Sequence, residues 1–167
     1  MPDLKWLDGY SGQSVDELLA LEGEYRIDSL VVAFDQALDQ KAARDGDDSL
    51  SGEERVIVAI QALESEVNNG GYRQFFQNSS REFTPIIVQA LERIRCARTA
   101  EITQRAIDAL HLPMLTVDAI EAALESDDSD EELNRCDEAY FKAGQEGEDI
   151  EGNLFAFIKN NKAVIAL

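Results

Sequence analysis

Hydrophobic side chains recur roughly every three to four residues along most of the chain, the spacing that gives an α-helix one apolar face. Two of the clearest runs are Val56, Ile60, Leu63 and Val67, then Ile87, Ala90, Leu91 and Ile94. We find no stretch with the period of two that is typical of a β-strand, and no internal repeat. The pattern therefore predicts an all-α fold, a single compact domain over residues 1–167 with about seven to nine helices.

Short capping signals indicate where these helices begin. Ser14 with Glu17 has the spacing of a capping box, in which two side chains bind the free N–H groups of a helix start, and Ser51 with Glu54 repeats that spacing. Pro85 suits the first turn of a helix, where its missing N–H costs little. We expect a helical segment after residue 14, another starting at 129 or 130, and helices near 28–43, 51–67, 84–94, 99–110, 116–124 and 148–160.

Charge is the property that most restricts the class of partner. The chain has 34 acidic and 15 basic residues, a net charge of −19, and its pI is near 4.2. Its 44% of hydrophobic residues can fill a core, which argues against a disordered acidic tail. Phosphates and anionic lipids repel such a surface, so we expect neither direct nucleic-acid binding nor membrane docking. A cationic partner, such as a protein that itself binds DNA, fits better.

The acidic residues are concentrated in two flanks. Residues 1–55 have a net charge of −9, residues 56–119 of −1 and residues 120–152 of −11. Three acids at helical spacing, Asp118, Glu121 and Glu125, predict one acidic row on a helix. The candidate partner-binding surface consists of Asp118, Glu121, Glu125, Asp127, Asp128, Asp130, Glu131, Glu132, Asp137 and Glu138.

The residue types that most enzymes need are scarce. His111 is the only histidine, and the chain has no zinc-protease, phosphate-loop or nucleophile-elbow motif. We therefore expect no catalytic site, no metal and no cofactor, and we place His111 at a helix end. Cys96 and Cys136 are expected to be reduced, buried thiols of a cytoplasmic protein, since the sequence shows neither a secretion signal nor a membrane-spanning stretch.

The most distinctive segment is LESEVNNGGYRQFFQNSS, residues 63–80. Its two glycines predict the end of a helix, because glycine adopts the left-handed backbone that helix ends often need. Three aromatic residues at i, i+3 and i+4 then predict a buried corner, with nearby amides binding backbone groups left open by the turn. The alternative is a pocket in which Tyr72, Arg73 and Gln74 meet a ligand or a protein. The motif residues are Asn69, Gly70, Gly71, Tyr72, Gln74, Phe75, Phe76 and Asn78.

This segment, EVNNGGYRQFFQNSS, resembles a bacterial domain family with an NGG-aromatic-xQFFxNS signature. The flanking ERVIVAIQALE and IIVQALERI and the later LNRCDEAYFKAGQEGEDIEGNLFAFIKNN are also similar to that family. The best-known member is an acidic DNA mimic. The resemblance implies an all-helical protein that binds a DNA-binding protein, such as a transcriptional repressor or a nucleoid protein, in competition with DNA. One departure is Arg95-Cys96, where the family suggests a Gly-Ala pair.

Three functions thus stay open. The first is a DNA mimic; the second is a helical adaptor that binds its partner by apolar packing; the third is an enzyme or a small-ligand binder at the signature motif. Ionic strength separates the first two, because salt weakens binding by charge much more than binding by packing. A homodimer is a further assembly that the sequence leaves open.

Overall fold

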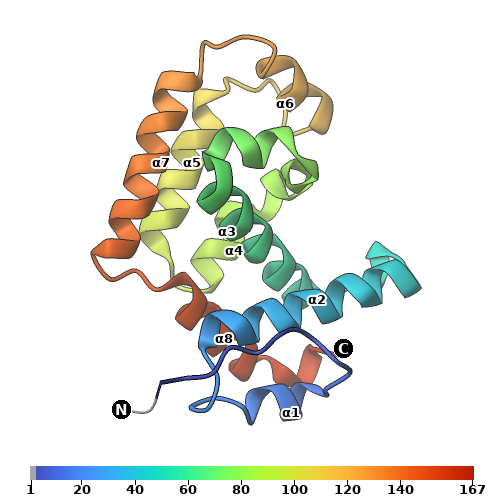
Figure 1. The fold of residues 1–167 in the computed structure, drawn as a ribbon. Helices are drawn as coiled ribbons and strands as arrows, with labels where there is room; N and C mark the ends of the chain where they lie inside the picture. Colours follow the sequence, from blue (N-terminus) through green and yellow to red (C-terminus); the bar gives the residue numbers. More distant parts are fainter. Residues whose placement is uncertain (1–2) are drawn as a thin grey trace. The chain divides into compact units, whose positions relative to one another are not determined.

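The computed structural model describes residues 3–167, and its regular structure is helical throughout this range (Figure 1). Within residues 3–167 the only β-type pairings are two isolated bridges, Lys5 with Tyr25 and Glu22 with Tyr25. The α-helices are α1 Val15–Leu19, α2 Ile27–Asp45, α3 Gly52–Gln77, α4 Thr84–Arg93, α5 Ala97–Ala109, α6 Val117–Ala123, α7 Asp130–Gln145 and α8 Ile150–Asn160; the 3-10 turns are η1 Asp47–Ser49, η2 Ser79–Phe83 and η3 Lys162–Val164. The predicted all-α class is confirmed.

The chain forms two compact units. Among the described residues, the first consists of residues 3–61 and Ile150–Leu167, and the second of Ala62–Asp149. The prediction of a single domain over residues 1–167 is not tested by this division, and it stays a prediction.

In the first unit, α2 packs against α8 and α1 packs against α2. Both predicted capping boxes form: Ser14 bonds Glu17, and Ser51 bonds Glu54. Glu54 is 1% exposed, and Lys41 Nζ lies 3.0 Å from its carboxylate, so the buried charge is paired. The fully buried apolar side chains of α2 and α8 include Leu30, Val31, Phe34, Leu38, Leu154 and Ile158.

In the second unit, α5 lies between α4 and α7 and packs against both. Figure 1 shows α5 and α7 side by side, with the C-terminal end of α5 and the N-terminal end of α7 at the same end of the unit. The buried side chains of these three helices include Ile87, Leu91, Ala106, Leu133, Cys136 and Ala143. Cys96 and Cys136 are both free and buried, as predicted.

The predicted helix stop at the two glycines is confirmed as a break inside α3. Gly70 has φ −153° and ψ 15°, and Gly71 has φ 78° and ψ −176°. The conformation of Gly71 is not the left-handed helical one that we predicted, because its ψ is extended; this combination is open essentially to glycine alone. The helix resumes directly after it and presents Tyr72, Phe75 and Phe76, which are all fully buried. The predicted aromatic corner is therefore confirmed as core.

Two other residues adopt a positive φ without being glycine. His111, with φ 49°, follows the end of α5 and is exposed, which confirms its predicted place at a helix end. Arg95, with φ 66°, stands between α4 and α5. A glycine suits this conformation better than any other residue. The Gly-Ala pair suggested by the family would therefore relieve strain at Arg95.

Candidate protein-interaction surface

The acidic segment, as we call residues 118–138, has ten acidic residues and one arginine. It runs from α6 through a connecting loop, residues 124–129, into the first half of α7. The predicted acidic row along one helix does not form. The α6 helix ends at Ala123 with Leu124 as its C-cap, so Glu125 lies in the loop and not on the face of Asp118 and Glu121.

Arg73, from the signature motif, anchors this loop at both ends. Its Nη2 donates to the backbone oxygen of Leu124 at 3.0 Å, and its Nη1 pairs with the carboxylate of Asp130. Sequence reasoning assigned Arg73 to an alternative ligand pocket and missed this role. No local signal reveals it, because the two partners lie 51 and 57 residues further along the chain.

Several of the predicted surface acids are paired within the protein. Glu121 pairs with Arg81, and Glu132 lies 3.7 Å from Arg105. Arg135 pairs with Glu131 at 2.6 Å and with Glu132 at 3.4 Å. Arginines from the nearly neutral centre of the sequence thus offset part of the acidic segment. These carboxylates are less available to a partner than the sequence suggests.

Asp137 supports the glycine corner. Its Oδ1 accepts a hydrogen bond from the Tyr72 N–H at 2.8 Å. A side chain at Gly71 would place its Cβ 2.3 Å from Asp137 Oδ2, so only glycine leaves room for this contact. Burial raises the pKa of the Asp137 carboxyl, while the Tyr72 hydrogen bond lowers that pKa and nearby Glu138 raises it. This acid is half-buried and structural.

The remaining five predicted surface acids are exposed, and their carboxylates have no ion-pair partner within residues 3–167. We call them the open carboxylates: Asp118, Glu125, Asp127, Asp128 and Glu138. Three of them lie on the loop that Arg73 anchors. Carboxylate oxygens form strong, charge-assisted hydrogen bonds with the ammonium and guanidinium groups of a cationic partner. The open carboxylates are therefore the part of the acidic segment best suited to binding.

The signature amides bind a carboxylate and not the backbone, which corrects our prediction. Glu66 Oε2 accepts from Gln74 Nε2 at 2.6 Å and from Asn78 Nδ2 at 2.9 Å. The two amides thereby tie the helix after the glycine break to the helix before it. Asn69 is exposed. An added Cβ at Gly70 would lie 2.0 Å from Gln74 Oε1, so a side chain there would displace the Gln74 amide.

The acidic flank of the first unit contains both paired and unpaired carboxylates. Lys159 pairs with Glu22 at 2.9 Å, and Lys162 pairs with Asp16 at 3.0 Å. Apart from Glu17, whose carboxylate caps α1, five exposed acids of this unit have no ion-pair partner in the described part of the chain: Asp3, Asp8, Asp39, Asp47 and Asp48. They match the open carboxylates in number and charge, which makes them a natural control set.

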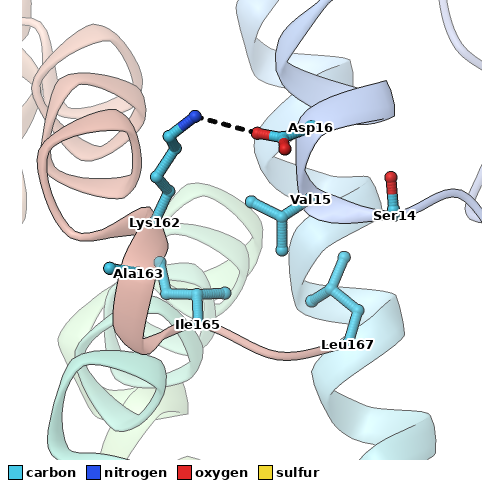
Figure 2. Close-up of a pocket in the computed structure, with 7 residues that line it drawn as sticks. All are labelled: Ser14, Val15, Asp16, Lys162, Ala163, Ile165 and Leu167. Atoms are coloured by element: carbon cyan, nitrogen blue, oxygen red, sulfur yellow. Dashed lines mark hydrogen bonds and ion pairs between the residues drawn. The ribbon is translucent and has the colours of Figure 1, made fainter.

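A surface pocket of the first unit lies between the start of α1 and the C-terminal segment (Figure 2). Val15, Ile165 and Leu167 give it apolar walls, and the Lys162–Asp16 ion pair borders it. A second pocket is lined by residues of the N-terminal segment 6–11 and by Tyr25. No residue of the predicted surface or of the signature motif lines either pocket. Neither pocket therefore supports a ligand site at the motif.

Two further findings concern the residues that the structure describes. Among them, no group of three or more His, Cys, Asp or Glu side chains is arranged to hold a metal ion. None of their helices combines the length and the apolar character needed to cross a membrane.

Comparison with known protein families identifies the family to which the chain belongs. A family model described as DMP19-like protein matches residues 48–161, more than half of the sequence. The chain belongs to the DMP19-like family. The match includes the signature motif and the whole acidic segment, and the family takes its name from DNA mimic protein 19. Comparisons with curated proteins and with solved structures found no match to this chain.

Proposed function

We propose that this chain is a DNA mimic that binds a basic DNA-binding protein, such as a transcriptional repressor or a nucleoid protein, and competes with DNA for it. The observation that supports this most is the set of open carboxylates on and beside an anchored loop. Membership of the DMP19-like family and the net charge of −19 support it as well. The protein acts in this proposal by binding alone, without catalysis.

Three physical effects favour a role for the open carboxylates in binding a basic partner over a role in solubility alone. A DNA-binding groove presents Lys and Arg side chains placed for phosphates, and fixed carboxylates of the same sign can occupy it. Because Arg73 holds the loop, less backbone freedom is lost when a partner orders it. Long-range attraction between opposite charges also speeds association. The two buried thiols, Cys96 and Cys136, agree with a reducing compartment such as the cytoplasm.

Displacement by DNA tests this proposal. The chain is immobilised, exposed to a bacterial lysate at low salt, and eluted with duplex DNA at constant ionic strength. A column bearing polyglutamate identifies proteins that bind any polyanion. We expect the chain to retain at least one DNA-binding protein that the polyglutamate column does not retain. Duplex DNA should then release that protein from the chain. Retention of cationic proteins by both columns alike, or bound protein that duplex DNA leaves in place, contradicts the proposal.

A further inference from the structure

An exposed apolar loop precedes the acidic segment. We define the apolar loop as residues 112–117, which comprise most of the connection from α5 to α6 and the first residue of α6. Met114 is 61% exposed, Leu115 45% and Val117 39%. Exposed apolar residues that occur singly are ordinary, whereas larger contiguous apolar patches mark interaction sites. These three lie within four consecutive residues of the chain.

The apolar loop is held in place by its own backbone. The Thr116 N–H donates to the Met114 carbonyl oxygen at 3.0 Å, and the Thr116 hydroxyl accepts from the Ala119 N–H at 3.2 Å as the N-cap of α6. Pro113 restricts the chain just before the exposed residues. Met114 and Leu115 are therefore presented from an ordered turn, which lowers the entropy lost on binding.

The apolar loop and four of the open carboxylates, Asp118, Glu125, Asp127 and Asp128, lie at one end of the second unit, while Glu138 lies midway along α7. The apolar loop follows the C-terminal end of α5, and loop 124–129 leads into the N-terminal end of α7. These two helix ends lie at the same end of the unit (Figure 1). Asp118 directly follows Val117 in the sequence. The end of the unit thus combines apolar side chains with negative charge.

We propose that the apolar loop is the packing anchor of this same surface, and that its occupant is a cationic protein with an apolar side chain or pocket among its Lys and Arg residues. This inference rests on the proposed function and adds apolar packing to its charge interactions. Proteins that contact base edges in DNA often place apolar groups beside their cations, because thymine offers a methyl group. Met114 and Leu115 would pack where such a methyl group lies.

Charge argues against a second copy of this chain as the occupant. Pairing the same face of two copies would bring two sets of open carboxylates together, and like charges at an interface oppose association. A cationic partner meets both parts of the surface favourably. Charge would then set the speed of encounter, and apolar packing would set the lifetime of the complex.

Two synthetic peptides test the anchor. Both are lysine-rich; one has two central leucines and its twin has two central serines. We expect the leucine peptide to bind the intact chain about tenfold more tightly than the serine peptide, since burying part of a Met or Leu side chain is worth roughly that factor. The preference should vanish in the triple variant Met114→Gln, Leu115→Asn, Val117→Thr, while the affinity of the serine peptide stays unchanged.

Matched controls separate the possible failures. The variant Leu4→Asn, Val164→Thr changes exposed apolar residues of the first unit, and it should keep the full leucine preference. Thermal melting verifies that each variant is folded. Equal affinity of the two peptides for the intact chain, or an undiminished preference in the triple variant, overturns the anchor but leaves the proposed DNA mimicry standing. A dimer of the intact chain that the triple variant loses assigns the apolar loop to self-association and also overturns the proposal.

Discussion

At Gly71 the backbone and a neighbouring carboxylate both exclude a side chain. The residue has φ 78° with extended ψ, and Asp137 occupies the space where a Cβ would lie. We expect Gly71→Ala to lower the free energy of unfolding by about 3 kcal/mol, the sum of backbone strain and a steric clash. Gly144→Ala is the control, because Gly144 is a helical glycine of α7 with open space around it. That variant should be more stable by about 0.5–1 kcal/mol. Equal effects in urea unfolding would contradict this account.

Asp35 gives the stability a dependence on pH. Burial raises the pKa of its carboxyl to about 8, and nearby Asp39 adds to the rise. In the unfolded chain the same carboxyl loses its proton near the ordinary pKa of about 4. Between pH 4 and pH 8 the folded state therefore holds a proton that the unfolded state has lost. The contribution of Asp35 to stability therefore falls as pH rises from about 4 to about 8. Asp35→Asn removes the effect.

We expect Asp35→Asn to raise the free energy of unfolding at pH 8 by roughly 2–5 kcal/mol and to change it much less at pH 4. Urea unfolding at both pH values measures this. Asp3→Asn, at an exposed carboxyl, controls for the removal of one negative charge and should change little at either pH. The same gain at pH 4 as at pH 8 would show that Asp35 does not hold the extra proton.

Among the secondary-structure elements, loop 124–129 depends on one side chain from the signature motif. Arg73→Gln removes both contacts of Arg73, with Leu124 and with Asp130. We expect faster amide hydrogen exchange in residues 124–130 and a loss of about 1–3 kcal/mol in the free energy of unfolding. Arg55→Gln is the control: it removes the same charge from an exposed position with no ion-pair partner among the described residues. Unchanged exchange in the loop of Arg73→Gln would mean that Arg73 does not anchor it.

The elements also show which features the sequence could predict. Ser14 and Ser51 cap their helices as expected, because a capping box needs only residues three apart. The aromatic corner was predictable for the same local reason. The partners of the surface acids were not, since Arg73, Arg81 and Arg105 reach them from distant parts of the chain. Half of the predicted acidic surface is therefore engaged inside the protein, and of these contacts only the pairs of Arg135 with Glu131 and Glu132, four and three residues away, could be read from the sequence.

For the molecule as a whole, the excess of negative charge dominates the electrostatics. Many of its cations already have carboxylate partners, so the remaining acids repel one another without compensation. We expect sodium chloride to raise the melting temperature by several degrees, because screening weakens this repulsion more than it weakens exposed ion pairs. We also expect a single transition, as the predicted single domain requires. A melting temperature that falls with salt, or two separate transitions, would contradict these expectations.

The most direct test of the central claim compares two variants of equal charge in binding to the DNA-binding protein that duplex DNA releases. In the first, the open carboxylates Asp118, Glu125, Asp127, Asp128 and Glu138 become amides; in the second, Asp3, Asp8, Asp39, Asp47 and Asp48 do. Five lost ion pairs should weaken the first variant about a hundredfold at low salt and flatten its salt dependence. The second variant should stay close to the intact chain. Equal binding by both variants, with the salt dependence intact, would contradict a mimic surface at the acidic segment.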